Sequence, residues 1–258
     1  MKKFLVILLT ALVFLSAAFI GVANVFRMDA VTLEAKMFSE AAKSEAEQMQ
    51  RDLQQAYLGE SALFAKEDAA KSVIEKYPYF RLTKFKIQYP NVLLVEATED
   101  MEVFAVRKGE EYYVLSQTGT VLDVRASDKN RVDGEANVII TGANPVGEIG
   151  DTVGGAGFAE TLKICALMSQ RLNGVRSNVE SIEFDRVEEG GRIFLCMREG
   201  VKICLVHAHL LTEEKAAALT EAYLTMSVEQ RLTGFLHVTE SLDGTQVIVK
   251  YQPNLLDE

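Results

Sequence analysis

The sequence contains no tryptophan and has only three histidines, three cysteines and four prolines among its 258 residues. Because aromatic residues make up 8% of the chain, we expect no aromatic platform for stacking against carbohydrate. No serine lies in a Gly-x-Ser-x-Gly pattern, and no cysteine stands in a recognisable catalytic signature. The cysteines, Cys165, Cys196 and Cys204, do not have the spacing of a zinc site. We therefore predict no catalytic residue, no metal site and no cofactor.

The chain also lacks an excess of positive charge. Its formal net charge is −10 at pH 7. The first 27 residues contain Lys2, Lys3 and Arg27 and no acidic residue, which leaves 24 basic residues against 37 acidic ones in the remainder. A body this acidic is repelled by nucleic acid and by anionic lipid surfaces. We therefore expect neither of them to be a partner of the folded part.

An apolar run dominates the N-terminus. Residues 4–26 carry no charge and are numerous enough to cross a hydrocarbon core of about 30 Å as a helix. We predict a transmembrane helix over 4–26 after a tail of residues 1–3. Because Lys2 and Lys3 precede it, the positive-inside rule places the N-terminus in the cytoplasm and the body outside. A cleaved signal peptide is the alternative, with small residues at 16–18 and 21–23, but the apolar run continues past the first of these sites.

The segment 28–100 predicts a small domain with helices and strands. Val31 and Leu33 are spaced as in a strand. Ser44 and Glu47 form a capping box that predicts the start of a helix, and Gly59 predicts its end. The other predicted elements are a helix at 69–77, stopped by a proline, and strands at 80–88 and 92–98, joined by a turn at 89–91.

In the segment 101–252, short strands alternate with two amphipathic helices. One helix is predicted at 158–172, and a second is predicted to be capped by Thr212. The glycine-rich stretch 147–157 lacks the patterns of phosphate-binding loops, so we predict a connecting loop there. Strands are predicted at 103–107, 112–115, 120–124, 138–142, 181–187, 192–198, 201–207, 234–239 and 245–251.

Cys196 and Cys204 lie on the two arms of a predicted hairpin. A two-residue Glu-Gly turn would pair Cys196 with Ile203. The same turn would pair Cys204 with Leu195, so the two thiols would lie on opposite faces, and a disulfide would need a different register. We expect buried free thiols, because free cysteine is among the most buried residue types.

Residues between 57 and 125 resemble those of a known family. They are Gly59, Leu63, Phe64, Tyr77, Pro78, Tyr89, Pro90, Asn91, Glu99, Tyr112, Tyr113, Val114, Leu115, Gly119, Val121 and Leu122. In this order they resemble the FtsQ/DivIB family of bacterial cell-division proteins. The chain departs from that family at 100–102, where a basic residue and a proline are usual, and at Ser116, where an aspartate is frequent.

The resemblance implies an α+β chain with an N-terminal transmembrane helix, a POTRA domain (β-α-α-β-β) and a mixed β domain with helices packed on the sheet. We place these parts at 4–26, 28–100 and 101–252, followed by a tail of residues 253–258. The resemblance also implies a non-enzymatic divisome scaffold that binds FtsB/DivIC- and FtsL-type partners outside the membrane and supports septal peptidoglycan synthesis. The location that it implies is the cell membrane at the division septum.

The final predicted strand is the candidate partner-binding element. At a sheet edge, its unpaired backbone groups would accept a strand from a partner, which is also what the resemblance implies. The predicted partner contacts are Val247, Val249, Lys250 and Tyr251. The alternative is that Val249 and Tyr251 are ordinary strand residues with one buried face. In the POTRA domain, the resemblance makes Asn91 and the strand 80–88 candidates for recruitment to the division site.

Two other functions stay open. One is a membrane-anchored or secreted cell-envelope hydrolase. Its only candidate catalytic residues in the sequence are Glu99, Asp100, His207 and His209. The other is a POTRA-type chaperone for exported polypeptides. His207 and His209 alternate on a predicted strand, and they would form a zinc site with His237 only if the two strands were neighbours. We favour an edge strand that runs into a loop over such a site.

Overall fold

The computed structural model describes residues 12–16, 21, 24–143, 147–155, 157–185 and 192–253. The chain divides into two compact units, Met1–Asp100 and Met101–Glu258, which we call unit 1 and unit 2. The boundary predicted from the sequence falls at the same place. Each unit has its own sheet.

The membrane-spanning helix predicted over 4–26 needs correction. Among the described residues, no helix combines the length and the apolar character needed to cross a bilayer. Only 12–16, 21 and 24–26 of the predicted segment are described, and the rest of it, with the tail 1–3, lies outside the described residues. The single-pass anchor, the topology and the location predicted from it are therefore not supported.

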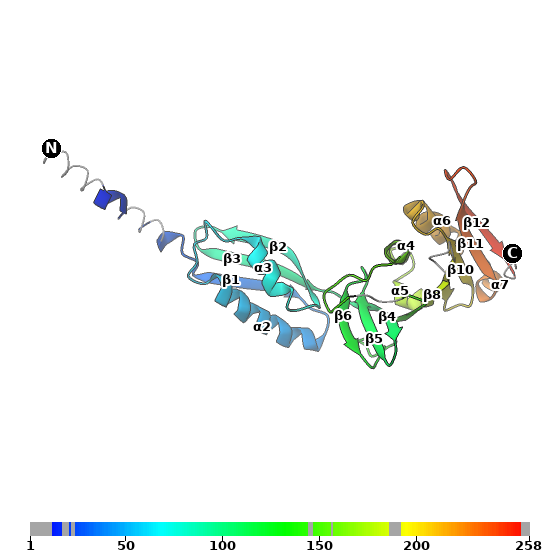
Figure 1. The fold of residues 1–258 in the computed structure, drawn as a ribbon, viewed down its shortest axis with the longest axis horizontal. Helices are drawn as coiled ribbons and strands as arrows, with labels where there is room; N and C mark the ends of the chain where they lie inside the picture. Colours follow the sequence, from blue (N-terminus) through cyan, green and yellow to red (C-terminus); the bar gives the residue numbers. More distant parts are fainter. Residues whose placement is uncertain are drawn as a thin grey trace. The chain divides into compact units, whose positions relative to one another are not determined.

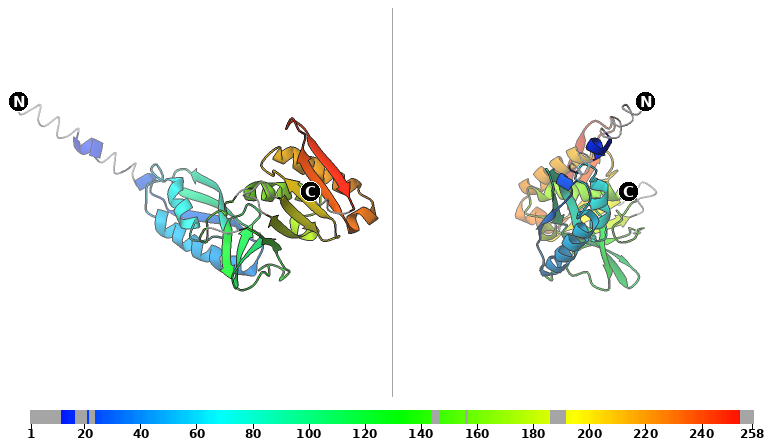
Figure 2. Two further views of the ribbon diagram at one scale, coloured as in Figure 1. Left: turned by 45° about the vertical axis from the view of Figure 1, so that its right-hand side comes forward. Right: turned by 90° about the vertical axis from the view of Figure 1, so that its left-hand side faces the viewer.

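From Ala30 onward, where every residue is described, unit 1 consists of a three-stranded sheet and two helices. In chain order, its elements are β1 (Ala30–Lys36), α2 (Glu40–Tyr57), α3 (Glu67–Ile74), β2 (Phe80–Gln88) and β3 (Val92–Glu99). The strand order is β1-β3-β2, with β1 parallel and β2 antiparallel to the central strand β3. Helix α2 packs on β1, α3 packs on β2, and the two helices contact each other (Figure 1, Figure 2).

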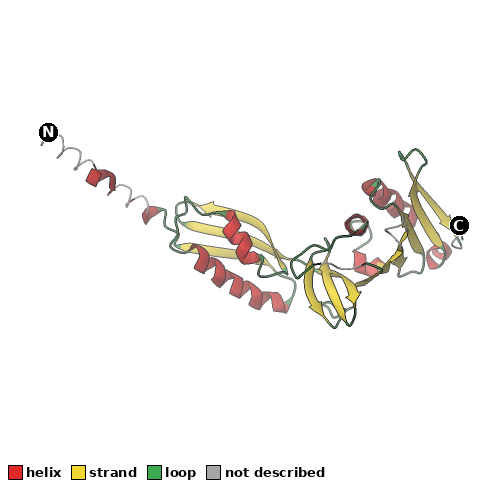
Figure 3. Ribbon diagram, in the orientation of Figure 1, coloured by secondary structure: helices red, strands yellow, loops and turns green. Residues whose placement is uncertain are grey.

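The periodicity of the sequence explains how unit 1 buries its core. Leu93, Val95 and Ala97 of β3 are almost fully buried, because alternate side chains of a strand point to the same face. The helices cover this face with apolar stripes, which include Met49 of α2 and Val73 of α3. Figure 3 shows these two helices in red against the yellow strands.

Helix α2 begins earlier than the capping box at Ser44 predicts, so this prediction is wrong. Ser39 is the N-cap, and its hydroxyl accepts a hydrogen bond from the Ala42 N–H at 3.2 Å. The Ser39 hydroxyl also donates to the carboxylate of Glu99 at 2.6 Å. The same carboxylate accepts the N–H groups of Phe38 and Ser39. The start of α2 is therefore fixed by β3, 60 residues further along the chain.

Unit 2 contains a mixed sheet and four helices among its described residues. The strands are β4 (Glu102–Lys108), β5 (Glu111–Ser116), β6 (Val121–Arg125), β7 (Val138–Thr141), β8 (Val179–Asp185), β9 (Arg192–Met197), β10 (Lys202–Val206), β11 (Phe235–Glu240) and β12 (Val247–Gln252). Their order is β12-β11-β10-β9-β8-β7-β4-β5-β6. Strand β7 is parallel to β4 and β8, and β10 is parallel to β11, while the other neighbours are antiparallel.

Helices on the sheet close the core of unit 2. They are α4 (Phe158–Ser169), α5 (Val175–Asn178), α6 (Thr212–Thr225) and α7 (Val228–Leu232). Phe158 and Leu219, from α4 and α6, join one buried cluster with Leu195 of the sheet. Gly142, just after β7, has a φ of +74°, and a Cβ there would lie 2.0 Å from the carbonyl oxygen of Phe184. The predicted α+β class, with mixed sheets, is thus observed.

Two local predictions in unit 2 are wrong. Cys196 pairs with Lys202 instead of Ile203. Cys204 pairs with Phe194, because the loop between β9 and β10 is longer than the predicted two-residue turn. All three cysteines of the chain are buried and form no disulfide bond, as predicted. Thr212 does not cap α6: the N-cap is Leu211 in a left-handed conformation, without a side-chain cap.

Candidate partner-binding edge

Strand β12 lies at one end of the strand order of unit 2. It pairs antiparallel with β11, so that Val249 lies opposite Val238 (Figure 1). Along its other side, the described part of the chain contains no strand. The predicted contacts Val247, Val249, Lys250 and Tyr251 all belong to this edge strand.

The hydrogen bonds of the β11–β12 hairpin show which backbone groups of β12 face outward. The Ser241 N–H donates to the Gln246 carbonyl at 2.8 Å, which makes these two residues a hydrogen-bonded pair. In an antiparallel ladder such pairs alternate, so Ile248 and Lys250 turn their N–H and C=O groups toward β11. The N–H and C=O groups of Val247, Val249 and Tyr251 point to the free edge.

The side chains of β12 divide between the two faces of the sheet. Val247, Val249 and Tyr251 pack partly buried against the core of unit 2, on the face that α6 covers. Ile248 and Lys250 lie on the opposite face and are exposed, Ile248 by 47%. Three of the four predicted contacts therefore offer backbone groups, and Lys250 offers an exposed side chain. Sequence reasoning missed Ile248, although alternation with Val247 and Val249 was a sufficient signal.

A close approach at Gly234 fixes the last residues of β12. Its φ is +83°, and a Cβ at this position would lie 2.6 Å from the carbonyl oxygen of Gln252. The Tyr251 hydroxyl donates to the Thr233 carbonyl at 3.3 Å. The end of the outward-facing edge is thus held against the segment that enters β11.

A buried lysine fixes the hairpin at its other end. Lys215 of α6 is fully buried, and its Nζ donates to the carbonyls of Val206 and His207 at 2.6 and 2.8 Å. It also donates at 2.9 Å to Oε2 of Glu240, the residue opposite Val247. Oε1 of Glu240 lies 2.5 Å from Nδ1 of His207. These contacts tie α6, the end of β10 and the end of β11 together.

The charge state of Glu240 follows from these contacts. Burial would raise its pKa, but hydrogen bonds from His207 and Lys215 outweigh burial and lower the pKa to about 2. A carboxyl group with a lowered pKa stabilises the fold above its unfolded pKa of about 4.5, and this contribution is lost as the pH falls toward about 2. At neutral pH, the carboxylate of Glu240 is therefore ionised, and its bonds to His207 and Lys215 stabilise the β11–β12 hairpin.

Exposed apolar side chains occur in the segment that precedes β11. Leu224, near the end of α6, is 38% exposed, and Val228 and Leu232 of α7 are 71% and 57% exposed. Arg231 holds α7 to α6: its guanidinium donates to the Leu224 carbonyl at 2.9 Å and lies 5.1 Å from the centre of the Tyr223 ring.

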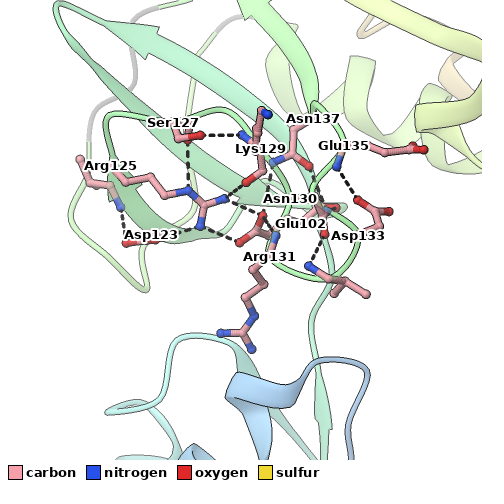
Figure 4. Close-up of polar contacts among 12 residues, drawn as sticks. Glu102, Asp123, Arg125, Ser127, Lys129, Asn130, Arg131, Asp133, Glu135 and Asn137 are labelled. Atoms are coloured by element: carbon pink, nitrogen blue, oxygen red, sulfur yellow. Dashed lines mark hydrogen bonds and ion pairs between the residues drawn. The ribbon is translucent and has the colours of Figure 1, made fainter.

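A second polar cluster surrounds Glu102, the first residue of β4 (Figure 4). Glu102 is 1% exposed, and its two carboxylate oxygens accept hydrogen bonds from the Arg125 guanidinium at 3.0 and 2.7 Å. The Arg131 N–H donates to the same carboxylate at 3.0 Å, and the side-chain amide of Asn130 donates to the Glu102 carbonyl at 2.8 Å. The cluster pins the loop after β6 onto β4, which is a structural role.

The acidic residues considered for a hydrolase have other roles. Glu99 is buried and serves the N-terminus of α2 through its contacts with Ser39. Asp100 lies 3.6 Å from the Arg81 guanidinium. Burial raises the pKa of Asp100, and Arg81 opposes this effect only in part.

The three histidines do not form a metal site. His207 and His209 have ring centres 6.1 Å apart, and His207 is engaged by Glu240. Strands β10 and β11 are neighbours, but His237 lies opposite Cys204 rather than His207. Among the described residues, no group of three or more histidine, cysteine, aspartate or glutamate side chains is arranged to hold a metal ion.

A scan against protein-family models finds no match to the chain, and a search of curated proteins finds none either. The resemblance to the FtsQ/DivIB family therefore rests on the residues quoted from the sequence.

Proposed function

We propose that this chain is a non-enzymatic divisome scaffold of the FtsQ/DivIB type. In this proposal, β12 accepts an extended segment of an FtsB/DivIC-like partner, an FtsL-like partner binds beside it, and the complex supports septal peptidoglycan synthesis. One observation carries the proposal: the N–H and C=O groups of Val247, Val249 and Tyr251 face a free sheet edge.

The physical basis of recognition is strand addition. Main-chain hydrogen bonds to a sheet edge supply affinity, and the side chains beside that edge select the sequence of the partner. Lys215 and Tyr251 hold the two ends of the hairpin. Strand β12 is therefore already ordered, and it loses little conformational entropy when a partner binds. Ile248 and Lys250 would contact every second side chain of the added strand on the face opposite α6.

The test is isothermal titration of the full chain with the FtsB/DivIC-like protein of the same organism. Val249→Pro removes an N–H that faces outward and leaves the bonds to β11 in place. We expect affinity to fall at least about tenfold, as expected for a lost hydrogen bond together with a steric clash. Val249→Thr keeps the N–H and the β-branched shape, and this control should bind within about threefold of wild type.

The outcome for Val249→Pro decides the proposal. If the proline variant is folded and binds the partner as tightly as wild type, β12 is not the binding edge. A charge reversal, Lys250→Glu, tests side-chain selection separately, because it changes the face beside the edge and leaves all outward backbone groups intact.

A further inference from the structure

Strand β1 is an outer strand of the sheet in unit 1, and its described neighbour is β3. The Leu33 N–H donates to Oε1 of Gln50 at 2.7 Å, and Nε2 of Gln50 donates to the Val31 carbonyl at 2.7 Å. Gln50 belongs to α2, so these bonds leave β1 on the side away from β3. Because backbone groups alternate along a strand, the C=O of Leu33 and both backbone groups of Ala35 also point to this outer side.

The amide of Gln50 takes the place of one residue of an added strand. In a parallel ladder, one residue of the neighbouring strand donates to the carbonyl before a given position and accepts from the N–H after it. Gln50 makes this pair of bonds around Thr32. The outward groups of Ala35, further along β1, have no hydrogen-bond partner among the described residues. The edge of β1 is therefore covered at its start and open beyond Leu33.

A groove of about 610 Å³ lies beside this open part of the edge, between β1 and α2. Leu33, Ala35 and Ala46 form its apolar part, and Lys43, Glu47 and Arg51 line it from α2. Met37, which follows β1 and also lines the groove, is 39% exposed. An extended chain beside Ala35 would place every second side chain in this groove.

Lys43, Glu47 and Arg51 bring charges of both signs to the groove, and Arg51 is the cation among them that can receive an acidic group of the occupant. Lys43 already has a partner, since its Nζ lies 2.8 Å from Glu40. The Arg51 guanidinium donates to the neutral side chain of Gln48 at 3.2 and 2.8 Å. Within the described residues, no carboxylate forms an ion pair with Arg51. Arg51 is therefore available to a carboxylate on a bound segment.

We propose that the β1–α2 groove binds an extended segment of a partner protein, which adds to the β1 edge beyond Leu33. Small aliphatic side chains of the segment enter the groove at alternate positions, and a carboxylate on the same side pairs with Arg51. Gln50 sets the register, because its amide occupies the preceding position on the edge. This site is separate from β12 and requires no property of that strand.

The probe for this site is the acetylated and amidated peptide Thr-Val-Thr-Val-Thr-Glu-Thr, whose valines and glutamate share one face. It is titrated into the 15N-labelled full chain, and amide hydrogen exchange is followed by NMR. We expect slower exchange at the Ala35 N–H and an unchanged rate at Val249. The peptide with lysine in place of glutamate should bind at least about fivefold more weakly, because it is repelled by Arg51.

Three variants make the test specific. Ala35→Pro removes an outward N–H that β3 does not use, and it should weaken binding of the peptide at least about tenfold. Ala35→Ser keeps the N–H and should bind within about twofold of wild type. Arg51→Glu should reverse the preference between the two peptides, and this result does not depend on how well the proline variant folds.

Several results would overturn the proposal. These are equal binding of the peptide to wild type and Ala35→Pro, protection at Val249 instead of Ala35, or the absence of any binding. Self-association of the full chain that is lost in Ala35→Pro would identify a second copy as the occupant and would also contradict a partner protein. An unchanged peptide preference in Arg51→Glu would refute the role of the carboxylate.

Discussion

The outer strands β1 and β12 belong to different units, and they differ in whether the backbone groups on their outer edges are hydrogen-bonded. At β1, the side-chain amide of Gln50 satisfies the first outward groups. At β12, no hydrogen bond within the described residues reaches the outward groups of Val249. Lys215 and Tyr251 instead hold the two ends of the hairpin. In our proposal, recognition uses the edge whose strand is held firmly and whose outward groups stay unpaired.

The largest expected effect on the free energy of unfolding comes from removing the Lys215 contacts that hold the β11–β12 hairpin. Lys215→Met leaves the carboxylate of Glu240 and two carbonyls without their buried donor, so we expect a loss of about 3 kcal/mol in the free energy of unfolding. Urea denaturation measures it. The double variant Lys215→Met with Glu240→Gln also removes the charge of the carboxylate that has lost this donor, and it should recover part of the loss. A loss below about 1 kcal/mol for Lys215→Met would contradict the role given to the lysine.

The next effect distinguishes the two sides of β12. Lys250→Pro removes an N–H directed at β11, while Val249→Pro removes one directed at the free edge. We expect Lys250→Pro to lower the free energy of unfolding by at least about 1 kcal/mol more than Val249→Pro, because only the first breaks the ladder. Thermal unfolding of the two variants measures the difference. Equal losses would mean that the assignment of outward groups is wrong.

A smaller effect is expected at the covered edge of β1. Gln50→Ala exposes the Val31 carbonyl and the Leu33 N–H to water, so the cost should be only about 1 kcal/mol. The more informative measurement is hydrogen exchange, which should speed up at Leu33 and stay unchanged at the β3-facing N–H of Glu34. Gln54→Ala, one turn further along α2, is the control. Unchanged exchange at Leu33 would show that Gln50 does not cover the edge.

The last prediction is a dependence of the stability on pH. The lowered pKa of Glu240, about 2, means that its ionised form stabilises the fold above its unfolded pKa and that this contribution fades as the pH falls toward 2. Between about pH 5 and pH 2, the free energy of unfolding should therefore fall more steeply in wild type than in Glu240→Gln. Denaturation at a series of pH values tests this. Parallel pH curves would contradict the carboxylate's role in fastening the hairpin.

The strands could be predicted because their signals are local. The hairpin of β2 and β3, the glycine after β7 and the final strand all follow from alternation and turn residues in short windows. Alternation also gives the faces of β12, including the exposed Ile248. Its place at the sheet edge is different, because strand order depends on contacts between distant segments.

The errors occur where a distant residue decides the local structure. Ser39 rather than Ser44 caps α2, since Glu99 of β3 binds the Ser39 hydroxyl and N–H. The loop between β9 and β10 is longer than two residues, and the Val201 N–H within it donates to the Arg231 carbonyl. Lys215 resembles a surface residue in the sequence, and only the packing of α6 against Glu240 explains its burial.

The most direct test of the central claim is amide hydrogen exchange along β12, measured with and without the FtsB/DivIC-like partner. In the free chain, the outward N–H groups of Val249 and Tyr251 should exchange quickly, and those of Ile248 and Lys250 should exchange slowly. With the partner at saturation, Val249 and Tyr251 should become protected. Protection of Val249 in the free chain, or fast exchange that persists at saturation, would contradict strand addition at this edge.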